Sequence, residues 1–271
     1  MSSALAEYVE LVGVAMFQRI DGQQVFTVSF GSGSDVVVGV SGGFGTWEIW
    51  QPPFELLSKT FRTVAYDHYG TGQTRVPPTL VTFENQVRLL GRILNRHTTA
   101  DSCVLAGDSS MTTVAIEAAY RWPETVSGLV LVSGGLDFSP TEAVTRFVQG
   151  LRRAFDPTVE AFVEMAVPED SEGHHRRWLR DIITRTGGNR AAALVESFYT
   201  VDVRDRLGYL KMPTVVIHGE LDAIPTSPLA AAQEMAHSIP NSELVVLPDT
   251  GHVPTLTRPV LIAEAITQLR A

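Results

Sequence analysis

From position 103 the chain reads Cys103-Val104-Leu105-Ala106-Gly107-Asp108-Ser109-Ser110-Met111-Thr112-Thr113, an apolar run that meets a small polar turn and then a helix-forming segment. A sharp turn from strand to helix exposes the side chain at its apex, and a serine in that position is the mark of a nucleophile elbow. The pattern Gly-x-Ser-x-Gly is present up to Met111, which stands where the final glycine is usual. The segment therefore predicts a parallel β-sheet with Ser109 presented at its edge.

Apolar runs that alternate with helical patterns extend this prediction along the chain. A strand that is apolar throughout is buried on both faces, as in a parallel sheet, and strand-helix alternation indicates a doubly wound sheet. An Asp21-Gly22 turn predicts an N-terminal hairpin. The predicted strands are 14–20, 24–29, 36–40, 63–66, 103–106, 129–133, 214–218 and 243–247, and the predicted helices between them are 54–58, 84–96, 112–121, 229–237 and 260–269.

One interval, from about Pro140 to Asp205, carries helical periodicity and no strand pattern. Helical spacing is evident at Val144, Phe147, Val148 and Leu151. We expect residues 139–205 to form a helical lid inserted between two strands of a core made of residues 1–138 and 206–271. The predicted fold class is therefore α/β, with a doubly wound, mostly parallel sheet and an inserted helical lid.

Composition excludes several functional classes. The 271 residues carry a formal net charge of −9, and binding nucleic acid requires a basic face. The single cysteine, Cys103, permits no internal disulfide. The N-terminal residues lack the basic and apolar regions of a signal peptide, and no apolar run is long enough to span a bilayer. We expect a cytoplasmic protein, monomer or homodimer, without nucleic-acid or membrane partners.

Ligands bind at the carboxyl ends of strands in open α/β sheets, and three loops at these ends carry a complete set of catalytic groups. Ser109 is followed in the chain by Asp222 and then by His252, each just after a predicted strand. A serine hydroxyl needs an imidazole to take its proton, and the imidazole needs a carboxylate to orient it. The sequence therefore predicts a Ser109–His252–Asp222 triad.

A tetrahedral oxyanion also needs hydrogen-bond donors. The backbone N–H of Ser110 is one candidate, because it follows the nucleophile at the start of a helix. The second should come from the glycine-rich loop Ser41–Thr46, where Gly43 or Phe44 presents its N–H.

With these pieces in order, the chain resembles the capped α/β-hydrolase superfamily, in particular its serine esterases and lactonases. The resemblance covers nearly the whole length and includes the turn Asp67–Thr74, which is similar to the family's D-x-x-G-x-G-x-S turn. Ser41 stands where the family usually has a structural histidine. The resemblance implies hydrolysis of a small to medium, mostly apolar ester or lactone through an acyl-enzyme, with no metal and no cofactor.

Several alternatives remain open at this stage. With Asp108 as the nucleophile, the chain would resemble an epoxide hydrolase or a dehalogenase, although the spacing to Trp122-Pro123 favours Ser109. Ser109 and Ser110 could be helix caps, and Glu220 or Asp249 could replace Asp222. His218 is expected to be a core histidine. Two other functions are a carbon–carbon hydrolase of vinylogous diketones and a ligand receptor on a hydrolase scaffold.

For the substrate pocket, the sequence offers apolar and glycine residues near the predicted loops. Aromatic walls are typical of small-molecule sites, and Trp50, Trp178 and Phe198 are further aromatic candidates. The predicted pocket residues are Gly42, Trp47, Met111, Phe138, Phe147, Tyr199 and Val253, beside the ring of Phe44. His174-His175-Arg176-Arg177 is interpreted as a solvated face of the lid rather than a metal or phosphate site.

Overall fold

A computed structural model describes residues 13–98 and 103–269, and within them one sheet of eight strands forms the centre of the molecule. The spatial order of the strands is β1-β2-β4-β3-β5-β6-β7-β8. Strands β3 to β8 run parallel, whereas β1 pairs with β2, and β2 with β4, in antiparallel fashion. The strands are β1 (Val14–Ile20), β2 (Gln23–Phe30), β3 (Val36–Val40), β4 (Arg62–Tyr66), β5 (Cys103–Asp108), β6 (Val126–Val132), β7 (Thr214–Gly219) and β8 (Ser242–Leu247). The predicted mostly parallel sheet is confirmed.

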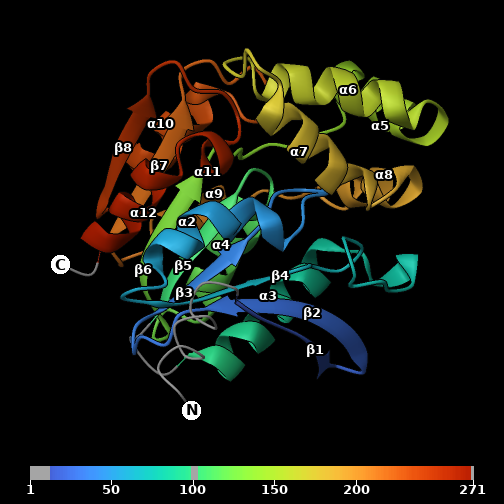
Figure 1. The fold of residues 1–271 in the computed structure, drawn as a ribbon. Helices are drawn as coiled ribbons and strands as arrows, with labels where there is room; N and C mark the ends of the chain where they lie inside the picture. The colour runs from blue at the N-terminus through green and yellow to red at the C-terminus, as the bar shows by residue number, and fades with distance from the viewer. Residues whose placement is uncertain (1–12, 99–102, 270–271) are drawn as a thin grey trace.

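Helices cover both faces of this sheet, so alternate strand side chains enter two separate cores (Figure 1). Val36 and Val38 of β3 belong to the core formed with α3 (Phe83–His97), α4 (Met111–Arg121) and α10 (Leu229–Ser238). Val37 points the other way, into the core formed with α2 (Gln51–Leu57) and α12 (Pro259–Gln268). This double burial explains why the strands are apolar throughout rather than alternating.

Five helices lie between β6 and β7 in the chain, and we call the first four of them the inserted helices. They are α5 (Glu142–Arg153), α6 (Phe155–Ala166), α7 (His174–Thr184) and α8 (Gly188–Glu196). They pack on one another around a third apolar cluster, and the side chain of Thr141 caps α5 by accepting from Val144 N–H. Figure 1 shows them grouped beyond the carboxyl ends of the central strands, and both views place them away from the C-terminus.

Four short elements complete the set of helices within the described residues. They are η1 (Trp47–Trp50), η2 (Pro78–Leu80), α9 (Arg204–Leu207) and α11 (Pro254–Thr257). The turn after β4 holds η1 in place, because Asp67 accepts hydrogen bonds from Trp47 N–H (3.0 Å) and Gln73 N–H (2.8 Å). Gly72 has a φ of 44°, and a Cβ there would lie 2.2 Å from Asp67 Oδ2, so only glycine fits.

The N-terminal hairpin is formed as predicted. Asp21 and Gly22 both have positive φ, 45° and 81°, as the turn of a two-residue hairpin requires. Among the described residues, no helix has the length and apolar character needed to cross a membrane.

Candidate active site

The turn between β5 and α4 has the geometry of a nucleophile elbow. Ser109 adopts a φ of 53°, a left-handed conformation that non-glycine residues adopt only at a cost. Its N–H donates to Val132 O (2.8 Å) and its carbonyl accepts from Thr112 N–H (3.1 Å), so the strained turn is fixed at both ends. A Cβ at Gly107 would lie 2.9 Å from the Cβ of Ala115, so glycine is needed for the helix to pack on the strand.

Three side chains from three loops meet at this elbow. His252 Nε2 lies 2.9 Å from Ser109 Oγ, and His252 Nδ1 lies 2.7 Å from Asp222 Oδ2. The Asp222 carboxylate is fully buried, and its Oδ1 accepts from Ile224 N–H (3.0 Å), which fixes its plane. With the ring proton on Nδ1, the imidazole donates to Asp222 and its Nε2 can accept the serine proton. The structure therefore brings together the three residues predicted as a triad.

The alternatives for these positions lie elsewhere. Asp108 ends β5 and its Oδ2 accepts from Gly42 N–H (3.3 Å) rather than occupying the apex of the turn. Glu220 and Asp249 are exposed, and Asp249 N–H donates to Glu220 Oε2 (3.4 Å). Ser110 is the N-cap residue of α4, but its side chain makes no capping hydrogen bond.

The electrostatics of the imidazole are set by burial and by two carboxylates. Burial lowers the pKa of His252, but the negative charge of Asp222, the hydrogen bond to it and the charge of Asp108 together outweigh burial and raise that pKa. His218, in β7, is also buried, with Nε2 3.9 Å from Asp222 Oδ2. Burial lowers the pKa of His218, so it stays neutral beside the Asp222–His252 pair.

The glycine-rich loop after β3 lies against the elbow. Gly43 N–H donates to Ser110 Oγ (3.2 Å), so this N–H points toward the elbow from the opposite side. A Cβ at Gly42 would lie 2.7 Å from Ser109 Cβ, so the loop can approach this closely only because it lacks a side chain there. The ring of Phe44 turns away into the adjacent cavity, and its carbonyl accepts from Thr186 Oγ1 (3.0 Å). Gly43, one of the two predicted donors in this loop, therefore has its N–H directed at the elbow.

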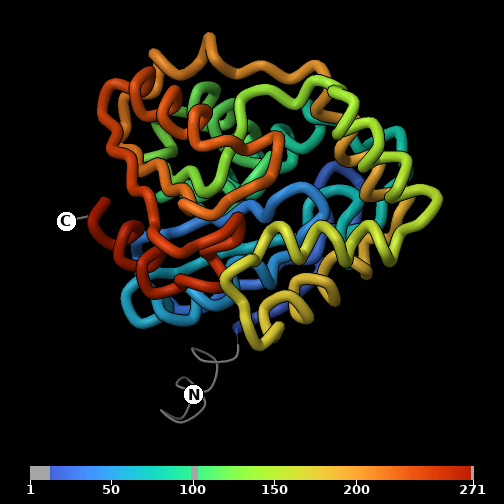
Figure 2. The backbone as a smooth tube through the Cα atoms, turned by 90° about the horizontal axis from the view of Figure 1, so that it is seen from above, coloured from blue at the N-terminus to red at the C-terminus, as the bar shows by residue number. Residues whose placement is uncertain are grey.

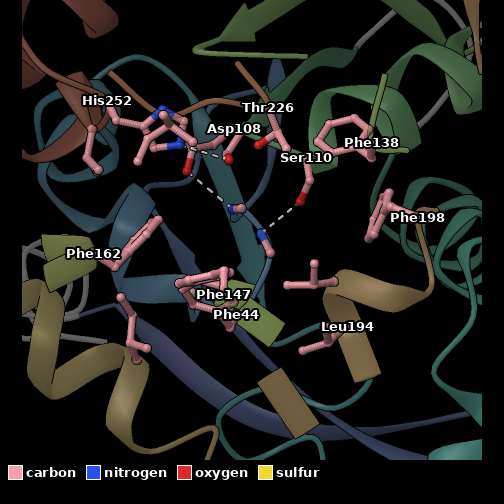
Figure 3. Close-up of a pocket in the computed structure, with 18 of the residues that line it drawn as sticks. Phe44, Asp108, Ser110, Phe138, Phe147, Phe162, Leu194, Phe198, Thr226 and His252 are labelled. Atoms are coloured by element: carbon pink, nitrogen blue, oxygen red, sulfur yellow. Dashed lines mark hydrogen bonds between the residues drawn. The ribbon is translucent and has the colours of Figure 1, made fainter. Parts of the chain in front are cut away.

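A mostly apolar cavity of about 260 Å³ opens onto Ser109 and His252 (Figure 3). Four predicted pocket residues, Gly42, Phe138, Phe147 and Val253, line it. A larger group of lining residues, which come mainly from the inserted helices and from the loop after β7, is not among the predicted pocket residues. These residues are Phe162, Met165, Leu179, Ile183, Leu194, Val195, Phe198, Ile224, Pro225 and Thr226.

Three side chains predicted for the pocket lie elsewhere. Met111, the first residue of α4, is fully buried in the core that α4 forms with the sheet and α3, so it is not available to line the cavity. Trp47 packs on Phe30, with ring centroids 6.2 Å apart, in the core on the other face. Tyr199 is half-buried against the inserted helices without reaching the cavity. Of the other aromatic candidates, Trp50 is buried in that core and Trp178 is exposed.

The cavity has two aromatic arms that meet at the elbow. On one side, the Phe162 ring stands edge-on to the His252 ring, with centroids 6.5 Å apart, and also contacts Phe44 (5.2 Å) and Phe147 (5.7 Å). On the other side, beyond Ser110, Phe138 and Phe198 lie with their centroids 5.7 Å apart. Figure 3 shows these two groups on opposite sides of the elbow.

The end of α6 is hydrogen-bonded to the backbone of the histidine loop. His252 N–H donates to Ala166 O (2.7 Å), and Gly251 N–H donates to Glu169 Oε1 (3.0 Å). Thr257 Oγ1 donates to the same Glu169 oxygen (2.9 Å). The inserted helices and the histidine loop are therefore directly connected at this point.

The charged motif in α7 gives no sign of a metal site. His174 and His175 face different carboxylates, Glu172 at 3.7 Å and Asp170 at 3.8 Å. Within residues 13–98 and 103–269, no group of three or more His, Cys, Asp or Glu side chains is placed to hold a metal ion.

Comparison with known proteins identifies the family of the chain. Residues 37–265 match the model of the family described as the alpha/beta hydrolase family. A pimeloyl-[acyl-carrier protein] methyl ester esterase of Nitrosomonas europaea is 28% identical, over 84% of this chain and 92% of its own length. A putative carbamate hydrolase RutD of Serratia proteamaculans is 27% identical, over 80% of this chain and 82% of its own length.

Solved structures share the fold at lower identity. An esterase from Exiguobacterium antarcticum aligns with a TM-score of 0.86 at 18% identity, covering 96% of this chain and 100% of its own. An enol-lactonase from Burkholderia xenovorans LB400 aligns with a TM-score of 0.84 at 20% identity, covering 94% of this chain and 99% of its own.

Proposed function

Since the chain belongs to the alpha/beta hydrolase family, we propose that it is a serine hydrolase that cleaves carboxylic esters or lactones through an acyl-enzyme. The observation that carries the proposal is the continuous hydrogen-bonded chain from Ser109 through His252 to Asp222, which opens into an apolar cavity. A fold hosts many functions, so the site supports the proposed activity more specifically than membership of the family does.

In the acylation step, His252 Nε2 takes the proton of Ser109 while Oγ attacks the carbonyl carbon. Asp222 holds the ring in the tautomer that leaves Nε2 free and stabilises the imidazolium that forms. The N–H groups of Ser110 and Gly43 donate to the oxyanion, and each such donor typically contributes about 3 kcal/mol to transition-state stabilisation. When the tetrahedral intermediate collapses, the imidazolium returns the proton to the departing alcohol oxygen.

In the deacylation step, the same groups act on water. His252 removes a proton from the water molecule that attacks the acyl carbon, and the proton returns to Ser109 Oγ as it leaves. We propose that residues 139–205 act as a lid over a core of residues 1–138 and 206–271. The apolar side chains that the inserted helices contribute to the cavity support this role, because they exclude bulk water from the acyl group.

The two arms of the cavity suggest how the substrate lies. The leaving oxygen must face His252, because that ring protonates it. The alcohol part therefore lies along the Phe162 side, and the acyl part extends past Ser110 toward Phe138 and Phe198. A cavity of about 260 Å³ with apolar walls fits a small to medium, mostly apolar ester or lactone.

The test is a hydrolysis screen with p-nitrophenyl esters of graded chain length, simple methyl esters, carbamates and several lactones. We expect the wild-type chain to turn over esters or lactones with apolar acyl groups. Ser109→Ala should lose about 10³-fold or more in kcat and should no longer react with a fluorophosphonate probe. Ser139→Ala, an exposed serine outside the cavity, is the matched control and should react as the wild type does.

Two results would contradict the proposal. Ester hydrolysis and fluorophosphonate labelling that survive in Ser109→Ala would show that Ser109 is not the nucleophile. Tight ligand binding by the wild type with no measurable turnover of any substrate in the panel would favour a receptor on a hydrolase scaffold.

A further inference from the structure

Asp108, the residue before the nucleophile, has a place in the site that the triad mechanism does not use. It is buried, with 4% of its surface exposed, and lines the cavity beside Ser109. Its Oδ2 accepts from Gly42 N–H (3.3 Å), while its Oδ1 is buried and has no hydrogen-bond partner among the described residues. A buried carboxyl oxygen without a partner is costly, so this residue needs a functional explanation.

The two residues that flank Ser109 hold consecutive peptides of the glycine-rich loop. Gly42 N–H donates to Asp108, and Gly43 N–H donates to Ser110 Oγ (3.2 Å), so the loop is attached on both sides of the nucleophile (Figure 3). Only the Asp108 bond can persist during the reaction, because Gly43 N–H must turn to the oxyanion. The position of Gly43 therefore depends on the bond that Asp108 makes to its neighbour.

Asp108 also acts on His252 through its charge. Burial raises the pKa of the Asp108 carboxyl to about 6, against the lowering effects of the His252 charge and the Gly42 hydrogen bond. Above that pH the carboxylate adds to the negative charge of Asp222, and both raise the pKa of His252.

The other titratable groups around His252 act differently. His218 is neutral and faces Asp222. Glu169, from the segment after α6, accepts from Gly251 N–H and Thr257 Oγ1. Asp108 and Asp222 are thus the two carboxylates whose charges raise the pKa of the imidazole.

We propose that Asp108 is a positioning residue of the hydrolytic site: it holds the Gly42 peptide, and with it the Gly43 N–H, against the elbow, and it supports the positive charge that His252 acquires. The inference rests on the proposed function. In the transition state the imidazolium is stabilised by this carboxylate, whereas the oxyanion is disfavoured by it. Because these two charge effects oppose each other, we expect kcat to depend mainly on the hydrogen bond that positions the Gly42 peptide. The charge of Asp108 should act mainly on the pH profile.

Two variants separate these roles. Asp108→Asn keeps an acceptor for Gly42 N–H and removes the charge, so the pKa of His252 should fall. Because His252 must be neutral to act as base, the acid limb of the kcat/KM profile should move to lower pH, by about half a unit or more. Asp108→Ala removes the acceptor as well, and we expect kcat to fall about five- to ten-fold below that of Asp108→Asn, the loss typical of one neutral hydrogen bond, with little change in KM.

Thermal unfolding of both variants and their rates of fluorophosphonate labelling accompany the kinetics, so that a folding defect is recognised. An acid limb that stays in place in Asp108→Asn, with equal kcat in the Asn and Ala variants, would overturn the inference. The wild type and Ser109→Ala are measured alongside. Hydrolysis that does not depend on Ser109 contradicts the proposed function itself, whereas Ser109-dependent hydrolysis that is indifferent to both Asp108 variants contradicts only this inference.

Discussion

In the catalytic corner, formed by Ser109, His252 and Asp222, the side chains are held by hydrogen bonds of 2.9 and 2.7 Å. In the aromatic wall, formed by Phe44, Phe147 and Phe162, the side chains meet only through ring contacts with centroids 5.2 to 6.1 Å apart. The corner comes from loops that directly follow strands of one sheet. The wall comes largely from the inserted helices and has no directional bonds between its members.

This difference separates two kinds of sensitivity. A hydrogen bond fails when its geometry or its charge changes, so we expect corner variants to lower turnover of every substrate. Apolar contact is non-directional and scales with area, so we expect wall variants to change which substrates are accepted. Corner variants that change only substrate preference, or wall variants that slow all substrates equally, would contradict this distinction.

The largest effect is expected in the corner, from Asp222→Asn. The amide cannot hold the His252 tautomer or support the imidazolium, so kcat should fall by about 10³- to 10⁴-fold. The loss should be the same for all substrates of the ester panel, measured by steady-state kinetics.

Asp249→Asn is the matched control for this change. Asp249 is an exposed acid in the loop that carries His252, and its positive φ of 47° suits asparagine. Its kcat should equal that of the wild type. A similar loss of kcat in both variants would show that Asp222 is not the acid of the triad.

In the wall, Phe162→Ala should change selectivity by about ten-fold. The substitution opens space next to His252, where the alcohol part of the ester is proposed to lie. For a methyl and a benzyl ester of the same acid, the ratio of kcat/KM values should shift in favour of the benzyl ester. The preference among esters that differ only in their acyl chain should stay unchanged.

Phe17→Ala, at an exposed phenylalanine of β1 away from the cavity, serves as the control and should leave both preferences unchanged. A shift along the acyl series in Phe162→Ala, with no shift along the alcohol series, would reverse the proposed orientation of the substrate.

Where wall and corner join, Glu169→Ala should have an intermediate effect. It removes the acceptor of Gly251 N–H and Thr257 Oγ1, so two hydrogen bonds between this part of the chain and the segment after α6 are lost. We expect kcat to fall by about ten-fold for all substrates and the free energy of unfolding by about 1–2 kcal/mol. Glu164→Ala, at an exposed position on α6, should match the wild type in both measurements. Unchanged kcat in Glu169→Ala would mean that the catalytic corner does not depend on this attachment.

The smallest effect is expected on the outer surface of the inserted helices. Arg152 and Glu196 pair across α5 and α8 through two hydrogen bonds of 2.6 Å, but both side chains are well exposed. Solvent and salt screen such a pair, so Arg152→Ala should lower the free energy of unfolding by no more than about 1 kcal/mol. Chemical denaturation in low and high salt measures this, and the difference should shrink at high salt. A change in ester preference in this variant would show that the outer surface influences the wall.

The corner was largely predictable from the sequence. The predicted strand 36–40 has the bounds of β3, and Ser109, Asp222 and His252 each lie just after a strand, as predicted. Predicting a strand and the loop after it needs only local information, because neighbouring residues show both the apolar run and the turn that ends it. The three residues then meet because parallel strands all end at the same edge of the sheet. Their roles in catalysis stay a proposal until the variants are measured.

The wall was predictable only in part. Phe44 and Phe147 are predicted pocket residues and line the cavity, and Phe162 lines it without having been predicted. Met111 is predicted for the pocket, but it is buried in the core. The periodicity of a helix shows that it has an apolar face, but not which neighbour that face meets.

The amino-acid sequence was enough to predict the strands and helices in their order along the chain, and the loops that carry the reactive groups, because these depend on local apolar pattern and turn chemistry. Which side chains of α4 and α6 reach the cavity became visible only in the folded molecule. The same is true of the hydrogen bond between Asp108 and the Gly42 peptide, 66 residues away along the chain. Packing between distant elements depends on the whole core at once, whereas the apolar pattern of a strand or helix lies within its own segment.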